Sequence, residues 1–242
     1  MSRIARSIPW RIGPGDSLVL GEARIERRED GDVTACDRYG CVEARVPPYL
    51  DVMAAPAPAI QRLLTATPYI YVEFEKRVYI EEGEDYWTLA PIEIEVYVRD
   101  TVLTRLSPAP VKFTLIGDVV DGLLARWFKS TIGYDRDELP DVEGTAIVRF
   151  IAKTTGVLVP GVGFNAANAS FYAGDDGSIY YSLLTVEVDG NILTAKVSDA
   201  PPLNGLREVI YPSKKARLAG LLRLMQPFTM KVEVARKSIT TQ

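Results

Sequence analysis

The stretch YIYVEFEKRVYI, residues 69–80, decides the fold class because its apolar residues alternate with polar ones. The even positions are apolar apart from Lys76, and the odd positions carry tyrosine, glutamate or arginine. Successive side chains of a β-strand point to opposite faces, so this pattern predicts a strand with one buried and one exposed face. Residues 92–99 repeat the parity, with four apolar residues set against Glu93, Glu95, Tyr97 and Arg99.

Other segments extend this reading along the chain. Comparable patterns predict strands at residues 111–116, 145–153, 178–188, 191–197 and 228–236. Asp-Gly pairs stand between candidate strands, where glycine readily supplies the positive φ that tight turns need. We therefore expect a mostly β protein with antiparallel sheets of the β-sandwich or jelly-roll type.

Two segments have apolar residues at helical spacing instead. In residues 118–131 Asp118 can cap the first turn, and Gly133 follows the last one. In residues 213–226 the cap is a serine, and a proline follows the segment. Two short amphipathic helices are predicted there.

The length of 242 residues fits one large β domain or two small ones. The Pro-rich connection at residues 107–110 is a plausible boundary. It would separate an N-terminal β unit, residues 1–107, from a C-terminal β unit, residues 108–242, that holds both predicted helices. A single domain over residues 1–242 is the alternative.

Missing residue types restrict the chemistry. The chain has no histidine and two cysteines, which excludes Ser-His-Asp and Cys-His catalysis, and also zinc and iron-sulfur sites that need four thiolate or imidazole ligands from one chain. A hard ion held by oxygen is the remaining metal option, and no cofactor is predicted.

Four residues separate Cys36 from Cys41, a spacing typical of a hairpin loop that puts the two cysteines opposite each other. Opposed residues have Cα atoms about 4.5–5.5 Å apart, inside the range of about 4.4–6.8 Å that a disulfide requires. A disulfide is therefore allowed. Two reduced thiols acting as small apolar residues are the alternative favoured in a reducing cytosol, and a redox-active pair is a third.

The segment LAPIEIEV, residues 89–96, follows an acidic loop and a strand bearing tyrosine and glutamate. In this arrangement, and in overall length, the chain resembles an archaeal family known as domain of unknown function 432. The resemblance implies an archaeal origin and assigns no activity.

Carboxylates and aromatic rings would share one surface if the strands near residues 69–80 and 92–99 were neighbours. Such a surface is suited to binding sugars or a hard cation, or to glycosidase-like catalysis. Cross-strand pairing and solubility are the ordinary reading of the same residues. The candidate ligand-binding residues are Tyr71, Glu73, Glu75, Glu93, Glu95 and Tyr97.

Charge is unevenly distributed. Residues 69–100 contain nine acidic and three basic side chains, and residues 200–242 contain eight basic and two acidic ones. Opposite patches of this kind can meet within one fold, join copies of the chain or bind another protein, whereas a sequence pI near 5.1 makes nucleic acid an unlikely partner. The candidate basic patch is Lys214, Lys215, Arg217 and Arg223.

Two glycine-bearing segments do not fit phosphate sites. Asp118 would repel a phosphate at the start of the predicted helix, and the loop predicted at residues 160–165 lacks the lysine of a P-loop. No apolar run is long enough to span a membrane, and the first twelve residues do not read as an export signal. Only seven Asn and Gln residues, with arginine outnumbering lysine, lean towards a thermophilic source.

The sequence thus favours a non-enzymatic binding or structural protein of an archaeal cytoplasm, working as a homo-oligomer or with a protein partner. The alternative is a carboxylate-based hydrolase, specific for sugar or dependent on a cation, that uses the acidic strand face.

Overall fold

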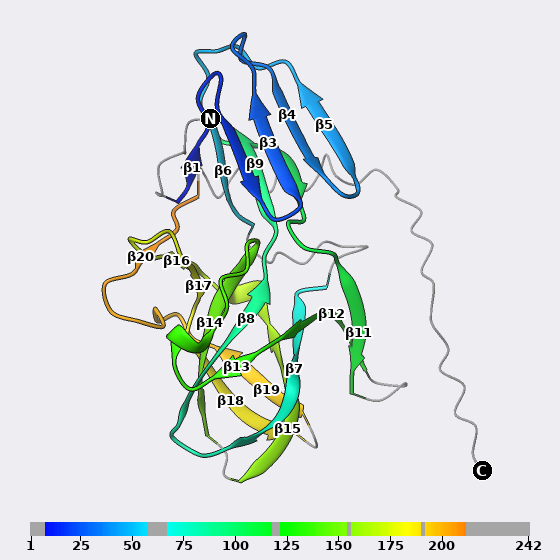
Figure 1. Cartoon of the computed structure of the whole chain (residues 1–242), viewed down its shortest axis with the longest axis vertical. Helices are drawn as coiled ribbons and strands as arrows, with labels where there is room; N and C mark the ends of the chain where they lie inside the picture. Colours follow the sequence, from blue (N-terminus) through cyan, green and yellow to red (C-terminus); the bar gives the residue numbers. More distant parts are fainter. Residues whose placement is uncertain (1–7, 58–66, 118–121, 154–155, 190–191, 212–242) are drawn as a thin grey trace, which may run out of the picture.

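The computed structural model describes residues 8–57, 67–117, 122–153, 156–189 and 192–211 (Figure 1). These residues form twenty β-strands and two short 3-10 helices, η1 (Arg136–Glu138) and η2 (Ala166–Asn168). The prediction of a mostly β protein is confirmed.

Two four-stranded antiparallel sheets form the top of the molecule in Figure 1. The first has the order β1-β6-β9-β10, and the second is the meander β2-β3-β4-β5. Strands of the first sheet are β1 (Trp10–Arg11), β6 (Val52–Pro56), β9 (Ile94–Val98) and β10 (Thr101–Leu106). Strands of the second are β2 (Ser17–Leu20), β3 (Ala23–Arg27), β4 (Val33–Asp37) and β5 (Gly40–Ala44).

A twelve-stranded mixed sheet forms the lower part. Its strands are β7 (Tyr69–Ile80), β8 (Asp85–Pro91), β11 (Lys112–Ile116), β12 (Leu123–Ser130), β13 (Ile132–Gly133), β14 (Thr145–Ala152), β15 (Val157–Asn165), β16 (Phe171–Ala173), β17 (Ile179–Tyr181), β18 (Leu184–Asp189), β19 (Ile192–Val197) and β20 (Arg207–Glu208). The order is β11-β12-β7-β15-β19-β18-β14-β17-β16-β20.

The large sheet closes on itself. Strand β13 continues β12 and pairs with β8, and β8 pairs with β14. Strand β12 itself pairs with β7, so the path from β7 through β15, β19, β18, β14 and β8 returns to its start. Several of these pairs are parallel, including β7 with β12 and β15 with β19. This closed, mixed sheet differs from the expected antiparallel sandwich.

The three sheets share one hydrophobic core. A single cluster of buried side chains runs from Ile25 in the meander to Ile94 in the first sheet and Phe150 in the large one. Strands β7 and β8 precede residues 107–110 but belong to the large sheet. The large sheet therefore contains strands from both sides of residues 107–110.

The expected alternation is confirmed for β7 but not for β9. On β7 the even residues Ile70, Val72 and Phe74 are buried, and the odd ones are half-buried or exposed. On β9, Glu95 and Tyr97 are buried like their apolar neighbours Ile94 and Val96. Strand β9 lies between β6 and β10 and is covered on both faces, so its odd positions do not face solvent.

The first predicted helix is wrong for the residues that can be compared. Residues 123–130 form strand β12, which hydrogen-bonds to β11 on one edge and β7 on the other. Trp127 and Phe128 suit a strand at least as well as a helix. Residues 118–121 and the second predicted helix, residues 213–226, lie outside the described residues, as does the predicted strand 228–236.

Residues 160–165, predicted as a flexible loop, belong to strand β15. Pro160 is tolerated inside the strand because the pairing with β7 shifts register between Val159 and Gly161. The next position needs glycine, since a Cβ on Gly161 would lie 2.3 Å from the carbonyl oxygen of Val72.

Candidate functional site

An open cleft of about 1100 Å³ lies between strand β2 and the large sheet. One wall is β2, all four residues of which line the cleft. The facing wall consists of the segment around residues 136–145 and the turn at residues 176–179. In Figure 1, β2 is the unlabelled dark blue strand beside β3, and it lies above β14 and β17. The cleft is thus built from segments far apart in the sequence.

The most buried side chains in the lining are apolar. Trp10, Leu89 and Ile179 are only 7%, 4% and 8% exposed, and Leu18 and Ile147 beside them are half-buried. These side chains come from both the small sheets and the large one. They give the cleft an apolar base on which a ligand can lose contact with water.

The exposed charges of the lining are mostly acidic. Four carboxylates face one guanidinium among the described lining residues, a net charge of −3. The five residues are Asp137, Asp141, Glu143, Asp176 and Arg136. The cleft therefore attracts cations.

Arg136 is held by a network at one end of the cleft. Its Nη2 donates to Asp176 Oδ2 at 2.6 Å and to Ser178 Oγ at 2.7 Å. The Ser178 hydroxyl and backbone N–H donate in turn to Asp176. The guanidinium also lies over the ring of Tyr180, 5.9 Å from its centroid. Asp176 therefore closes the turn before β17 and neutralises the arginine.

This network shifts two pKa values. Burial alone would raise the pKa of Asp176, but hydrogen bonds from Ser178 and the charge of Arg136 bring it below its ordinary value. Burial raises the pKa of Tyr180, despite the opposing charge of Arg136. Near neutral pH Asp176 is ionised and Tyr180 is protonated, so neither is poised to exchange a proton.

The low pKa of Asp176 gives a pH-dependent contribution to stability. A carboxylate with a depressed folded-state pKa stabilises the fold above its ordinary value of 3.8, and this contribution is lost as the pH falls through the folded-state value. We expect Asp176→Asn to be less stable than wild type at about pH 6 and the difference to shrink by about pH 2. Urea unfolding at both pH values measures it.

Asp175→Asn is the matched control, because this neighbouring carboxylate is 92% exposed and pairs only at the surface with Arg207. The same pH dependence in both variants would contradict the role given to the Asp176 network.

The structure does not bring the predicted ligand-binding residues together. Strand β7 lies in the large sheet, and β9 lies in the four-stranded sheet β1-β6-β9-β10. Their acidic faces therefore do not form one surface. On β7, Glu73 Oε2 accepts a hydrogen bond from Trp127 Nε1 at 2.8 Å, Glu75 is exposed, and Tyr71 is half-buried with its pKa raised by burial and by Glu73. These side chains lie outside the cleft.

Glu93, Glu95 and Tyr97 belong to a buried ionic cluster instead. Arg105 lies across from Glu95 in the register of β9 and β10, and it pairs with Glu95 at 2.5 Å and with Glu93 at 3.0 Å. The Tyr97 hydroxyl donates to the other oxygen of Glu95. The side chains of Arg105 and Glu95 are 8% and 6% exposed.

The same cluster connects the sheet β1-β6-β9-β10 to the large sheet. Arg126, on β12 of the large sheet, lies 3.8 Å from Glu93. Beside this contact, and within the large sheet, the buried hydroxyl of Tyr181 on β17 donates to the carbonyl of Pro91 on β8, and burial raises the pKa of this tyrosine. Glu93, one of the carboxylates that the sequence suggested for binding, thus pairs with an arginine from each of two sheets, Arg105 on β10 and Arg126 on β12.

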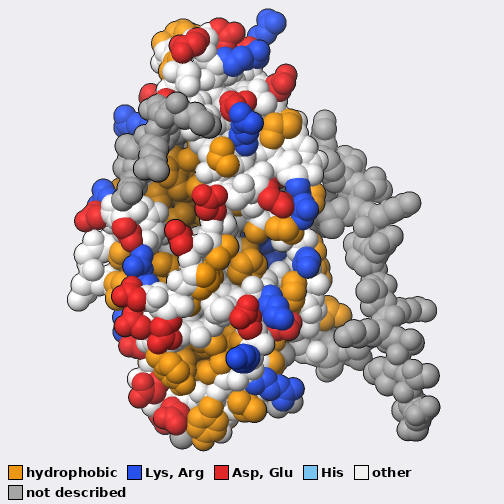
Figure 2. Space-filling model, in the orientation of Figure 1, with side chains coloured by type: hydrophobic (Ala, Val, Ile, Leu, Met, Phe, Trp, Pro, Cys, Tyr) orange, Lys and Arg blue, Asp and Glu red, His pale blue; other side chains and the backbone are white. Residues whose placement is uncertain are grey.

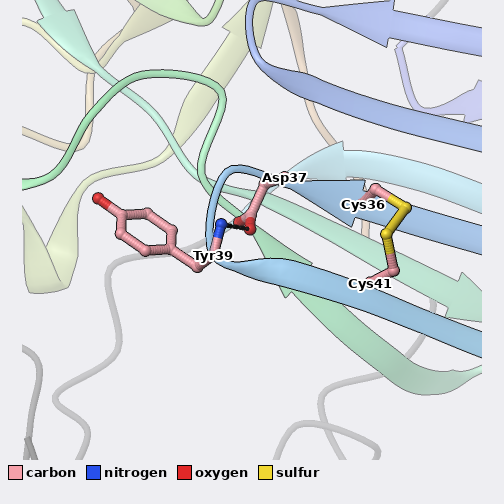
Figure 3. The surroundings of a disulfide bond; sticks show 4 residues. All are labelled: Cys36, Asp37, Tyr39 and Cys41. Atoms are coloured by element: carbon pink, nitrogen blue, oxygen red, sulfur yellow. Dashed lines mark hydrogen bonds between the residues drawn. A yellow bond between two sulfur atoms is a disulfide. The ribbon is translucent and has the colours of Figure 1, made fainter.

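Cys36 and Cys41 are joined by a disulfide across the β4–β5 hairpin (Figure 3). The register puts them opposite each other, as the spacing predicts, but the turn has only two residues, because Asp37 pairs with Gly40. Cys41 is exposed and Cys36 is half-buried. The bond therefore lies on the surface of an edge hairpin.

The turn beside the disulfide contacts the connection between β10 and β11. Asp37 accepts hydrogen bonds from the backbone N–H groups of Tyr39 and Ser107, and the Tyr39 hydroxyl accepts one from Val111 N–H. Figure 3 shows the first of these beside the sulfur atoms. The predicted boundary segment is thereby fastened to the meander.

The structure does not support the remaining predicted sites with any arrangement of side chains. Lys214, Lys215, Arg217 and Arg223 lie outside the described residues. On the face seen in Figure 2, acidic and basic side chains are interspersed. The described residues contain no group of three or more histidine, cysteine, aspartate or glutamate side chains placed to hold a metal ion.

Sequence reasoning missed the cleft itself. In the sequence Asp176 belongs to one of the Asp-Gly pairs that signal a turn, and no pattern singles out Arg136. The spacing of Asp176 and Ser178 is a local signal for the turn, but nothing local links either residue to Arg136, which is 40 positions from Asp176.

Comparison of the chain with curated proteins and with solved structures found no match. Among the described residues, no helix has the length and apolar character needed to cross a membrane. Residues 11–231 match the model of a family described as "Protein of unknown function (DUF432)". This match covers most of the chain and confirms the resemblance carried by residues 89–96. The chain therefore belongs to the DUF432 family.

Proposed function

We propose that this chain is a non-enzymatic binding protein and that its ligand, which carries both cationic and apolar groups, lies in the cleft beneath β2. The observation that carries the proposal is the combination of an apolar base, with Trp10, Leu89 and Ile179, and a lining of net charge −3. Pockets that bind ligands commonly join a large apolar surface to a few polar groups that fix orientation.

The arrangement of the polar groups favours binding over hydrolysis. A glycosidase needs one carboxyl group with a raised pKa beside a second, ionised one. In the cleft Asp176 has a lowered pKa and is bonded to Arg136 and Ser178. Three of the four glutamates of the hydrolase alternative are engaged outside the cleft, Glu73 with Trp127, and Glu93 and Glu95 with Arg105.

We also propose a cytoplasmic location in a thermophilic archaeon. Intracellular disulfides are rare except in hyperthermophiles, so the Cys36–Cys41 bond and the low content of Asn and Gln support one another.

The proposal is tested by the binding of short peptides of opposite charge. We expect a fluorescent peptide of alternating lysine and valine to bind the wild-type protein, and its glutamate-valine counterpart not to bind. Affinity should fall as salt is raised, because exposed charges are screened. In Asp137→Asn/Asp141→Asn it should fall by about tenfold, since each exposed ion pair contributes about 0.2–1 kcal/mol. Fluorescence anisotropy measures each affinity.

Glu75→Gln/Asp100→Asn is the control, since it removes two exposed charges outside the cleft and leaves the net charge equal to that of the test variant. Equal weakening by both double variants would show that net charge alone, and not the cleft, attracts the peptide. Equal affinity for both peptides would contradict the proposal.

A further inference from the structure

Strand β2 is an edge strand that borders the cleft with its backbone. In the described part of the chain it pairs with β3 alone. Neighbouring residues of a strand point to opposite faces, yet all four residues of β2 line the cleft. A cleft on one face of a strand would be lined by every second residue, whereas a cleft along the strand's edge is lined by consecutive residues. The free edge of β2 therefore faces the cleft.

The register identifies the backbone groups that this edge offers. Leu20 pairs with Ala23 across the two-residue turn, so Leu20 and Leu18 exchange hydrogen bonds with β3. The N–H and C=O groups of Ser17 and Val19 then point away from β3. Neither residue has a hydrogen bond to its backbone on that side from any described residue. Two donors and two acceptors at the spacing of a β-ladder are thus presented to the cleft.

The other edges of these sheets carry charges that discourage pairing, and β2 does not. Charged residues on edge strands prevent unwanted strand addition. The opposite edge of the meander, β5, has Glu43 and the disulfide, and the edges of the large sheet have Lys112 on β11 and Arg207 on β20. Strand β2 reads SLVL, and Val19 is 50% exposed. It is an uncharged edge that no second strand covers among the described residues.

We propose that the occupant of the cleft is an extended, basic polypeptide segment of a partner protein, which adds to β2 as a further strand of the meander. The idea rests on the proposed function and specifies its ligand. Strand addition satisfies the free groups of Ser17 and Val19, and alternate side chains of the added segment then lie on opposite faces. Those on one face extend the apolar surface of Leu18 and Trp10. Those on the other are free to reach Asp137 and Asp141.

The dimensions fit a short motif. A four-residue strand is about 13 Å long, so it pairs with about four or five residues of a partner. Glu143 marks one end, because its Oε2 accepts a hydrogen bond from Gly21 N–H, directly after β2, at 3.0 Å. Charge complementarity selects lysine or arginine on the partner.

Val19→Pro tests the backbone contact directly. Proline removes the outward N–H while sparing the bonds between β2 and β3. We expect the affinity for the lysine-valine peptide to fall by at least about tenfold, because the peptide loses a hydrogen bond and faces the proline ring. Glu43→Pro is the matched control, since the N–H of Glu43 on β5 points away from β4 and proline removes it in the same way. The affinity of this variant for the peptide should equal that of the wild-type protein.

A second measurement leaves the protein unchanged, in case Val19→Pro fails to fold. Two versions of the same peptide carry N-methyl groups, one on its odd residues and the other on its even residues. In one of them the methyl groups replace the N–H groups that would donate to Ser17 and Val19. That version should bind wild-type protein at least about tenfold more weakly than the unmodified peptide. If both methylated peptides and Val19→Pro retain wild-type affinity while Asp137→Asn/Asp141→Asn weakens it, strand addition is wrong and the cationic site stands. If the unmodified peptide does not bind, both proposals fail.

Discussion

Arg105→Met is expected to lower the free energy of unfolding by about 3–5 kcal/mol, because it leaves buried carboxylates without their main counter-charge. Arg105 pairs with Glu95 at 2.5 Å and with Glu93 at 3.0 Å, and its side chain is only 8% exposed. Burial would lower the pKa of Arg105, but the two carboxylates raise it above its ordinary value. Methionine keeps much of the side-chain volume, so the loss reports charge more than packing. Denaturant unfolding monitored by circular dichroism measures it.

The reason for so large a loss is desolvation and not the strength of an isolated ion pair. Removing one member of a buried pair leaves the other ionised in a low-dielectric interior. Glu93 keeps Arg126 at 3.8 Å, whereas Glu95 keeps only the neutral hydroxyl of Tyr97 as a side-chain donor among the described residues. Glu95→Gln in the Arg105→Met background should therefore recover about 1–2 kcal/mol.

Arg24→Met is the control for this experiment. Like Arg105, Arg24 pairs with a glutamate, in this case Glu26. The side chains of Arg24 and Glu26 are 60% and 42% exposed. Exposed pairs contribute about 0–1 kcal/mol, so this variant should be nearly as stable as wild type. A loss in Arg105→Met no larger than in Arg24→Met would refute the assignment of a buried cluster between the sheets.

The contrast between β7 and β9 shows what the sequence could predict. Both strands have apolar residues at even positions and polar ones at odd positions, and both are strands. The pattern gives the type of element reliably, because side-chain alternation is a property of the backbone. It does not give the environment of the polar face, which depends on Arg105, ten residues beyond Glu95.

The wrong prediction of a helix at residues 118–131 has a different origin. Leu123, Leu124, Trp127 and Phe128 are spaced for a helix, yet β12 fills the gap between β7 and β11. Parallel pairing of residues about 56 positions apart overrides local spacing, and no local signal announces it. The cleft was out of reach for the same reason, because β1, β2, β8 and the turn before β17 meet only in the folded chain.

The hairpins were the most predictable part, since their registers follow from short connections. Gly31 and Gly177, each in an Asp-Gly turn, have φ values of +97° and +87°, and these turns connect β3 to β4 and β16 to β17. Cys36 and Cys41 are paired in the register that their spacing requires. Whether they would be bonded was not fixed by spacing, because reduced thiols fit the same register.

Arg27→Met is expected to cost about 4 kcal/mol of unfolding free energy, since hydrogen bonds to a charged group contribute about 1.5–3 kcal/mol each and several are lost together. Arg27 is 4% exposed and donates to five backbone carbonyls. Burial lowers its pKa, with Asp51 and Asp16 opposing. The acceptors are the carbonyls of Ile12, Gly31, Pro47, Pro48 and Leu50, at 2.7–3.3 Å.

These carbonyls belong to three separate connections around the small sheets. The chain between β5 and β6 contains two adjacent prolines, Pro47 and Pro48, which have no N–H to offer a ladder, so its carbonyls need a donor from elsewhere. The planar guanidinium, with its five N–H donors, supplies several at once, and a lysine ammonium has only three. Arg27→Lys should therefore recover only part of the loss, about half.

Arg28→Met is the matched control one residue away. Its side chain is 61% exposed and pairs with Asp32 at 3.3 Å, so its replacement should cost less than about 1 kcal/mol. Equal stabilities of Arg27→Met and Arg28→Met would mean that the carbonyls of residues 47–50 find water when the guanidinium is removed. A large difference, only partly reduced by lysine, would show that one buried arginine organises the connections that hold β2 and β3 in place beside the cleft.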